Sequence, residues 1–244
     1  MESWQKRTGM LVGEEGLRRL ADSSVAVIGL GGVGAYAAEM LVRAGVGHLV
    51  LLDSDVVGET NKNRQLLALD STMGRPKCEV MRERLLDINP SVRLDVIAEY
   101  LTEENVAQLL GGRRIDFLVD AIDTLSPKLA LIHYCVKVAG IPVVSSMGSG
   151  AKYDATKVRL TDVSKSFNCP LAYMVRKKLR RMGIEKGFKV VFSEELPDDN
   201  AIVKLSEQEQ REVSNKKSQV GTISYLPAVF GCVCAQAAIA HLLA

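Results

Sequence analysis

The sequence predicts an α/β fold, a doubly wound and mostly parallel sheet, and three observations support this prediction. Short apolar runs rich in β-branched residues alternate with segments of helical periodicity. A glycine-rich turn, GLGGVG, separates the first apolar run from the first helical segment. An acidic residue, Asp53, ends the second apolar run. Strand, glycine turn, helix and acid in this order are typical of the start of a Rossmann-like sheet.

Strands and helices alternate along the chain as far as Gly150. Val25–Leu30 has the length of a buried strand, and Ala35–Arg43 has helical spacing. A later helix ends at Asn89-Pro90, and Thr102 is expected to cap the next one. The other predicted elements are strands at His48–Leu52, Leu94–Ala98, Phe117–Ala121 and Val143–Ser146, and helices at Lys77–Ile88, Glu103–Leu110 and Pro127–Ala139.

The pattern changes after Gly150, which predicts an appended C-terminal α+β segment. We expect one domain over residues 1–244, with its core at about residues 22–150 and the appended segment at about residues 151–244. The segment is predicted to contain an exposed strand, a basic helix, a second strand, a charged and mobile crossover, and a closing apolar helix, at Lys157–Val163, Pro170–Met182, Lys189–Ser193, Glu194–Ser218 and Tyr225–Ala244.

The apolar end of the chain allows two interpretations. Leu226–Ala244 approaches the length of a membrane span, but it contains Pro227, Gln236 and His241. Isolated polar side chains are costly in lipid. The pattern therefore favours a helix buried against the sheet or in a subunit interface over one that contacts a membrane.

Composition limits the classes of protein. The chain has 244 residues, 47% of them hydrophobic, and a net charge of +2, which is typical of a soluble globular protein. The polar start, MESWQKRTG, does not resemble a signal peptide. The five cysteines include no C-x-x-C pair, so neither a zinc knuckle nor a disulfide framework is indicated. A reducing cytoplasm is the expected location.

The glycine turn predicts a phosphate-binding site. Gly29, Gly31 and Gly34 form G-x-G-x-x-G, with Gly32 as a fourth glycine. Absent side chains let phosphate oxygens approach main-chain N–H groups, and the N-terminus of the following helix adds a partial positive charge. Asp53 has the spacing of an acid that binds ribose hydroxyls. These features predict a nucleotide, but they leave open whether it is NAD.

Residues after Asp53 favour ATP. Hydride transfer requires a proton relay, and His48, His133 and His241 each lie in a structural context. Attack at an α-phosphorus instead requires donors and fixed positive charge where pyrophosphate leaves. Asn61, Arg64 and Lys77 can supply them, and Asp123 can ligate Mg²⁺ through oxygen. Surface ion pairing is the plainer interpretation of either cation taken singly.

Several motifs in this order resemble those of the ubiquitin-activating-type adenylyltransferases, which include enzymes of molybdopterin and thiamine synthesis. They are GLGGVG, the strand ending at Asp53, TNKNRQ, GRPK and DAID, within about residues 7–148. The resemblance implies that the glycines cradle phosphates and that Asp53 takes the ribose. It also implies a homodimer in which Arg7 completes the partner's site. The remaining implied nucleotide-binding residues are Asp55, Asn61, Arg64, Gln65, Lys77 and Asp123, with Arg7, Arg64, Lys77 and Asp123 acting in catalysis.

Within that superfamily, MLVGEEGLRRL, DAIDTLSPKLALIHYC and PLAYMVRKKLRR are most similar to the bacterial tRNA threonylcarbamoyladenosine dehydratases. This resemblance implies a tRNA carrying threonylcarbamoyladenosine, whose carboxylate is adenylated before ring closure, and no DNA partner. One alternative is adenylation of a ubiquitin-like sulfur carrier, with sulfur-transfer proteins as partners and a possible role for Cys169. Another is a regulatory or scaffold module that binds a nucleotide without turnover.

A tRNA substrate predicts a basic surface. Arg176, Lys177, Arg180 and Arg181 lie on one predicted helix, at spacings that let several of them share a face and contact phosphates. A solvated helix face is the alternative, because basic side chains are also favoured near a helix C-terminus.

Overall fold

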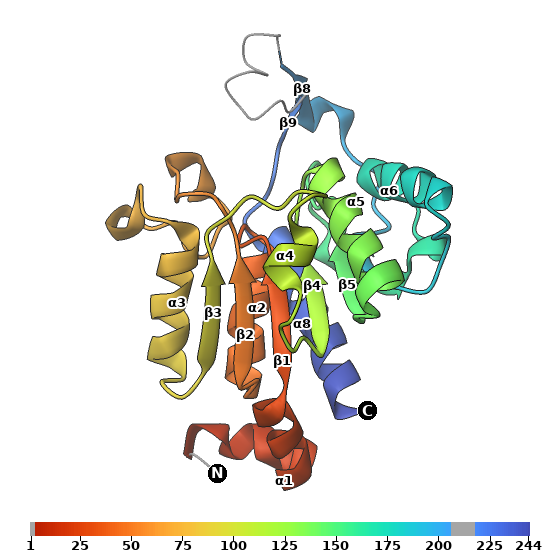
Figure 1. Ribbon diagram of the computed structural model, residues 1–244. Coiled ribbons are helices and arrows are strands. Elements are labelled where there is room, and N and C mark those ends of the chain that lie inside the picture. Colours follow the sequence, from red (N-terminus) through yellow and green to blue (C-terminus); the bar gives the residue numbers. More distant parts are fainter. Residues whose placement is uncertain (1–2, 206–217) are drawn as a thin grey trace.

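The computed structural model describes residues 3–205 and 218–244, and its centre is a seven-stranded sheet (Figure 1). The strand order is β3-β2-β1-β4-β5-β7-β6, and every neighbouring pair is parallel except β7 and β6. A separate pair, β8 and β9, is antiparallel. The strands are β1 Ser24–Ile28, β2 His48–Leu52, β3 Arg93–Ile97, β4 Phe117–Asp120, β5 Val143–Ser146, β6 Val158–Asp162, β7 Lys189–Ser193, β8 Ile202–Lys204 and β9 Ser218–Val220.

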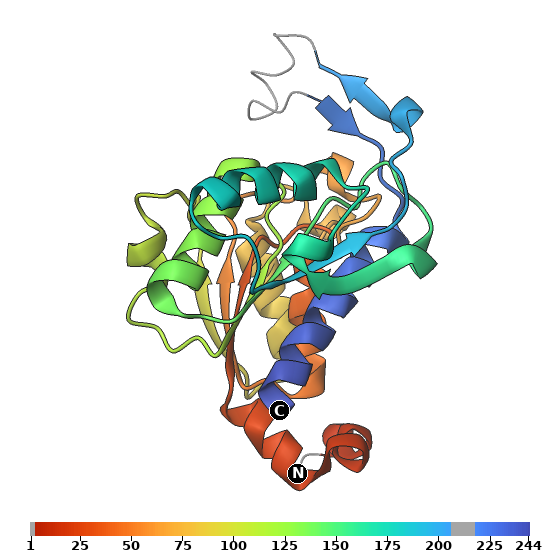
Figure 2. The same cartoon turned by 90° about the vertical axis from the view of Figure 1, so that its right-hand side faces the viewer.

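Helices cover both faces of this sheet (Figure 2). One face packs against α2, α3 and α8, and the other against α4, α5 and α6. Helix α1 lies at the end of the sheet where β1 begins, whereas β8 and β9 lie beyond the opposite end (Figure 1). The helices are α1 Lys6–Asp22, α2 Gly34–Ala44, α3 Lys77–Ile88, α4 Val106–Leu110, α5 Leu125–His133, α6 Pro170–Arg181 and α8 Tyr225–Leu243.

The central strand shows why the sheet must be covered on both sides. All five residues of β1 are buried. Val25 and Val27 join the core beneath α2 and α8, whereas Ala26 and Ile28 join the core on the other face. Successive side chains of a strand point to opposite faces, so a continuous apolar run fits only a sheet with two covered faces.

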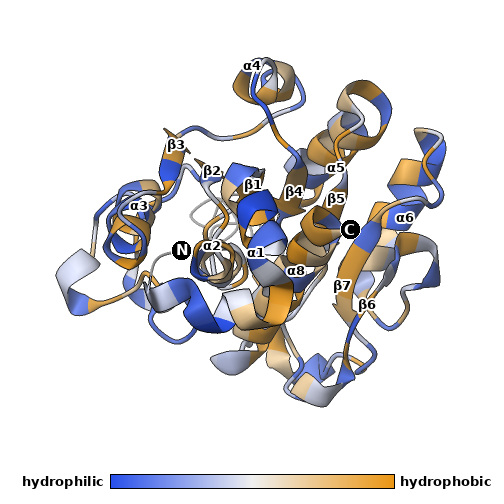
Figure 3. Ribbon diagram, turned by 90° about the horizontal axis from the view of Figure 1, so that it is seen from below, coloured by the Kyte–Doolittle hydropathy of each residue, from blue (hydrophilic) through white to orange (hydrophobic). Residues whose placement is uncertain are grey.

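Helix α8 is the one described helix that is long and apolar enough to cross a membrane by length and composition. It packs against α2 and crosses the sheet, with Leu226, Phe230 and Cys234 fully buried in the core (Figure 3). These contacts correspond to the buried helix that the sequence favours.

The predicted doubly wound α/β fold is confirmed, and most predicted strands match to within a residue or two. The start of one helix is wrong: α4 begins at Val106, not Glu103. Thr102 and Asn105 exchange hydrogen bonds between side chain and backbone in both directions, and this closes a turn before the helix. The strands predicted after Gly150 extend the main sheet through the β5–β7 pairing.

Two further differences concern the ends of the chain. The sequence analysis assigned no helix before β1, but α1 occupies Lys6–Asp22, with a break at Gly13, where φ is 75°. The charged crossover predicted at Glu194–Ser218 contains β8, and β9 begins at its last residue. Residues 206–217 of that prediction lie outside the described residues.

Candidate nucleotide-binding site

The candidate site lies at the carboxyl end of β1, where the sheet changes direction. The chain leaves β1 for β2 on one side, whereas β4 lies on the other side of β1. In open α/β sheets, ligands bind in the crevice at such a switch point. The glycine turn that the sequence singles out, residues 29–34, directly follows β1 at this position.

The glycine turn can be built only without side chains at two of its positions. Gly29 has φ of 90°, in the left-handed region. A Cβ on Gly34 would lie 1.7 Å from the carbonyl oxygen of Gly29. Gly34 begins α2, and no side chain caps this helix at Val33. The first N–H groups of α2 therefore have no side-chain acceptor at the cap, as expected at an anion-binding helix end.

Asp53 lies against this turn. Its Oδ2 accepts a hydrogen bond from the Leu30 N–H at 2.6 Å, and its Oδ1 accepts one from the Asp55 N–H at 2.8 Å. Burial raises the pKa of Asp53, although the Lys77 ammonium and both N–H donors act in the opposite direction. The two hydrogen bonds fix the carboxylate of Asp53 at the edge of the glycine turn.

Lys77 continues the same cluster from the start of α3. Its Nζ lies 2.8 Å from Oδ2 of Asp55, which is 68% exposed, whereas the Lys77 side chain is only 5% exposed. The buried ammonium is therefore held in place by a carboxylate that faces solvent. A fixed cation beside a phosphate-type turn can stabilise negative charge that develops there.

The loop after β2 brings further polar side chains to the turn. A Cβ on Gly32 would lie 3.4 Å from the backbone oxygen of Arg64, and one on Gly31 would lie 3.8 Å from Nε2 of Gln65. The Arg64 guanidinium donates to the Thr60 carbonyl and to Oδ1 of Asn63, within its own loop. Asn61 is used locally, since its Oδ1 accepts from the Gly58 N–H. In this structure Asn61 stabilises the loop that carries Arg64.

A cleft of about 410 Å³ opens beside Arg64. Thr60, Asn63 and Arg64 line one side, and the β8–β9 region lines the other. Asn63 joins the two sides by donating to the Thr222 carbonyl at 3.0 Å. The cleft provides room for a second group next to a nucleotide in the glycine turn.

Asp123 follows β4, at the neighbouring strand end. Its loop touches the glycine turn, because a Cβ on Gly29 would lie 2.9 Å from the Ala121 carbonyl oxygen. Within residues 3–205 and 218–244, no group of three or more His, Cys, Asp or Glu side chains could hold a metal ion. Mg²⁺ commonly uses one or two carboxylates together with substrate phosphates, so a single aspartate fits that role.

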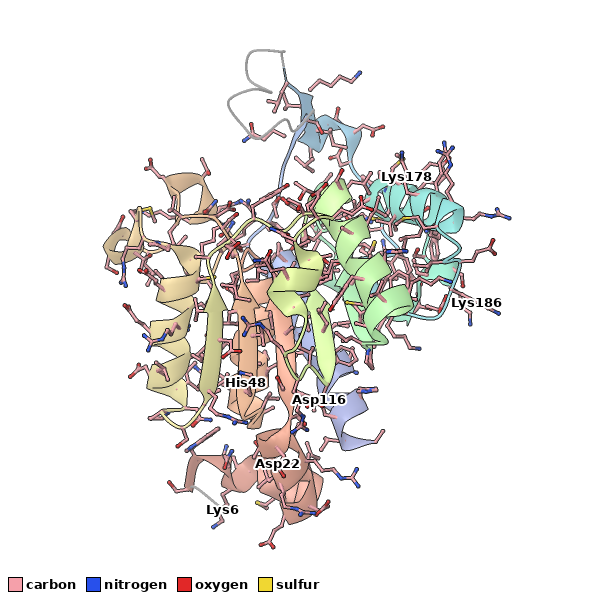
Figure 4. The ribbon with its side chains drawn as sticks, viewed as in Figure 1. Lys6, Asp22, His48, Asp116, Lys178 and Lys186 are labelled. Carbon is pink, nitrogen blue, oxygen red and sulfur yellow. The ribbon has the colours of Figure 1, made fainter. Side chains whose placement is uncertain are left out.

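Arg7 lies far from this cluster within its own chain. It is exposed on α1, at the end of the sheet opposite the glycine turn, next to Lys6 (Figure 4). The exposed apolar side chains of the N-terminal segment are Trp4, Met10 and Leu11, the last two more than four-fifths exposed. Geometry therefore separates Arg7 from the other predicted catalytic residues of the same chain.

The predicted RNA-contacting residues all lie on α6, near the labelled Lys178 (Figure 4). Two of them already have partners: Arg176 donates to Oγ of Ser166, and Arg180 pairs with Glu185 at 3.2 Å. Lys177 and Arg181 are exposed. The helix thus presents part of the predicted cationic surface to solvent.

The sequence analysis did not identify a buried polar cluster beside this site. Asp120 lies at the end of β4, Lys128 on α5 and Ser145 in β5, and none of the three is exposed to solvent. The signal available in the sequence was the first aspartate of DAID, which ends an apolar strand.

Together, the fold and this cluster define a Rossmann-like nucleotide-binding protein with a cationic site at the switch point of its sheet. The chain belongs to the ThiF family, whose model matches residues 5–244. This membership confirms the superfamily resemblance predicted from the motifs.

Individual relatives extend the comparison. The chain is 40% identical over 234 residues to the tRNA threonylcarbamoyladenosine dehydratase of Bacillus subtilis, covering 93% of this chain and 89% of that protein. It is 34% identical over 155 residues to the molybdopterin-synthase adenylyltransferase of Escherichia coli, covering 64% and 61%. The structure of E. coli tRNA N6-threonylcarbamoyladenosine dehydratase in complex with ATP matches with a TM-score of 0.88 and 35% identity, covering 100% of this chain and 96% of that chain.

Proposed function

We propose that this protein is an ATP-dependent tRNA threonylcarbamoyladenosine dehydratase. The observation that carries the proposal is the joining of the glycine turn, Asp53, Asp55 and Lys77 into one cluster at the switch point. The overall match to an E. coli dehydratase solved with ATP supports it. So does the match over nearly the whole chain to the B. subtilis dehydratase.

The reaction has two steps. The threonyl carboxylate of the modified adenosine attacks the α-phosphorus of ATP, so that a carboxyl–AMP bond forms and pyrophosphate leaves. A nucleophilic atom of the same modified group then attacks the activated carbonyl carbon, loses its proton, and releases AMP as the ring closes. ATP consumption thus removes the elements of one water from the substrate, and no catalytic cysteine is required.

The residues of the site have separate roles in this scheme. The glycine turn binds phosphate oxygens through backbone N–H groups, and Asp53 binds the ribose. Arg64 and Lys77 stabilise the triphosphate and the leaving pyrophosphate, because their charge lies where negative charge develops. Asp123 would hold Mg²⁺, which when bound neutralises phosphate charge. Asp55 positions Lys77, and Gln65 borders the glycine turn.

We also propose that the protein acts as a homodimer in which Arg7 reaches the partner's site. Arg7 lies at the wrong end of its own sheet to reach the glycine turn, and exposed Met10 and Leu11 accompany it on α1. A symmetric dimer would bury these apolar side chains and carry each Arg7 to a second site. A cytoplasmic location fits the tRNA substrate and the five free cysteines.

The ribose role of Asp53 predicts a binding defect. We expect Asp53→Ala to raise the Kd for ATP by about tenfold or more, since it removes the ribose acceptor and the acceptor of the Leu30 N–H. The rate at saturating ATP should fall less. Calorimetric titration with ATP measures the affinity, and Asp70→Ala, which changes an exposed aspartate of the following loop, is the control. Equal ATP affinity in both variants would refute the ribose assignment.

The basic surface of α6 predicts a salt-dependent tRNA defect. We expect Lys177→Ala/Arg181→Ala to raise the KM for tRNA and lower the salt dependence of tRNA binding by up to about two phosphate contacts. ATP affinity should not change. Arg82→Ala/Arg93→Ala removes two exposed cations on the α3 and β3 side and serves as the control. If both double variants bind tRNA with the same salt slope, α6 is not the contact surface.

The alternative activity, adenylation of a ubiquitin-like sulfur carrier, would make Cys169 a candidate nucleophile. Cys169 is only 5% exposed. Burial also raises the pKa of the Cys78 and Cys135 thiols to about 12, which keeps them protonated at neutral pH. The 34% identity to a molybdopterin-synthase adenylyltransferase keeps this activity as the second candidate, with sulfur-transfer proteins as its partners.

We therefore expect Cys169→Ser to retain tRNA-dependent AMP formation, because the ring-closing nucleophile belongs to the substrate. Rate measurements on the folded variant test this, with Cys232→Ser, at an exposed thiol of α8, as the control. Complete loss in Cys169→Ser alone would favour the carrier-activating function.

One assay tests the proposed function directly. Radiolabelled ATP is incubated with the protein and either tRNA carrying threonylcarbamoyladenosine, the same tRNA lacking the modification, or a carrier protein ending in Gly-Gly. We expect AMP only with the modified tRNA. Formation of AMP with the carrier instead would replace the proposal with the alternative activity.

A further inference from the structure

The buried cluster of Asp120, Lys128 and Ser145 is the strongest feature that the proposed mechanism leaves unused. Nζ of Lys128 lies 2.6 Å from Oδ2 of Asp120 and donates to Oγ of Ser145 at 3.0 Å. Ser145 in turn donates to the same Oδ2 at 2.5 Å. None of the three residues has any exposed surface. The cluster joins β4, α5 and β5 from inside the protein.

Stability alone explains this cluster poorly. Removing two charges from water is expensive, and an apolar replacement of similar volume is often neutral or stabilising. Yet no buried side-chain nitrogen or oxygen in the described part of the chain lacks a hydrogen-bond partner, so the network is complete. A complete buried network fixes one arrangement of its members.

The second carboxylate oxygen of Asp120 shows what is being fixed. Oδ1 accepts a hydrogen bond from the Ile122 N–H at 3.1 Å. The Ala121 N–H also donates to the Ile28 carbonyl at 2.9 Å. These bonds hold the backbone that leads from β4 to Asp123 in a tight turn.

That backbone contacts the phosphate-type turn. A Cβ on Gly29 would lie 2.9 Å from the Ala121 carbonyl oxygen, and one on Gly34 would lie 3.1 Å from the Ala121 Cβ. The two turns are therefore packed with almost no free space, and a displacement of Ala121 must move the glycine turn as well.

We propose that Lys128 is a positioning residue for the ATP site. Its buried ammonium, with Ser145, holds Asp120 in the orientation that binds the Ile122 N–H. Asp120 thereby sets Ala121 against the glycine turn and places Asp123 at its rim. Lys128 acts through Asp120 and touches neither ATP nor tRNA. The inference rests on the ATP site of the proposed function, but not on the identity of its second substrate.

The test replaces the whole cluster by apolar groups. Asp120→Val/Lys128→Met/Ser145→Ala leaves no buried charge unpaired, so the variant should fold with a melting temperature close to that of the wild type. We expect its Kd for ATP to rise about tenfold or more, because the Ile122 N–H has lost its acceptor. We also expect faster amide hydrogen exchange in peptides that cover residues 121–123.

The matched control is Glu39→Met/Arg84→Met. It removes a pair between a nearly buried carboxylate and a cation, at 2.5 Å, that joins α2 to α3 and lies outside the β4 turn. This control should bind ATP as the wild type does. Wild-type ATP affinity and wild-type exchange at residues 121–123 in the triple variant would overturn the inference.

Ser145→Ala provides the test if the triple variant does not fold. It removes one bond to Asp120 and one to Lys128. We expect ATP affinity to fall about twofold to fivefold, with faster exchange at residues 121–123. Unchanged affinity and exchange would overturn the inference. Because neither readout needs tRNA, a wild type that binds ATP but does not act on tRNA would refute only the proposed function.

Discussion

Lys77→Met should lower tRNA-dependent AMP formation by about 100-fold or more, the size expected when a preorganised charge is removed from a transition state. The Lys77 ammonium is buried and fixed by Asp55 at 2.8 Å, so it meets the leaving pyrophosphate without reorganising. ATP affinity should stay within about tenfold of the wild type, since the glycine turn and Asp53 remain intact.

Single-turnover kinetics at saturating ATP, together with an ATP titration, separate these two effects. Lys62→Ala is the matched control, because Lys62 is a lysine of the neighbouring loop that pairs with exposed Asp70. A normal single-turnover rate in Lys77→Met would show that its charge is not used in the reaction.

Arg7→Ala should be nearly inactive for a different reason, namely that it damages the partner's site. Mixing Arg7→Ala with Lys77→Met should then restore activity, because some mixed dimers carry one site with an intact Lys77 and a donated Arg7. Random exchange makes about half of the dimers mixed, each with one good site of two, so recovery of about a quarter of the wild-type activity is the ceiling.

Lys6→Ala, at the neighbouring exposed position of α1, should remain active and controls for damage to the helix. Subunit exchange is verified with differently tagged chains. If the mixture stays inactive after exchange, Arg7 either acts within its own chain or has no part in the reaction.

The parts of the site that are close in sequence could be predicted. The glycine turn, the start of α2 and Asp53 follow one another along β1 and β2, and local spacing is enough to place them. The β–α alternation likewise follows from hydrophobic periodicity, because a strand buried on both faces is continuously apolar.

The parts that depend on distant contacts could not be predicted. No local pattern indicates that Asp55 fixes Lys77, or that Asp120, Lys128 and Ser145 meet inside the protein. The start of α4 failed because the Thr102–Asn105 turn competes with the helix for the same backbone groups. The position of α1 at the far end of the sheet, which makes Arg7 remote from its own site, is also a tertiary feature.

The central claim is that ATP cleavage drives loss of water from threonylcarbamoyladenosine in tRNA. The most direct test is mass spectrometry of nucleosides from modified tRNA after incubation with the protein and ATP, with AMP measured in the same reaction. The account predicts conversion of threonylcarbamoyladenosine to a nucleoside lighter by one water, with one AMP formed for each nucleoside converted. An unchanged nucleoside in the presence of a protein that binds ATP would contradict it.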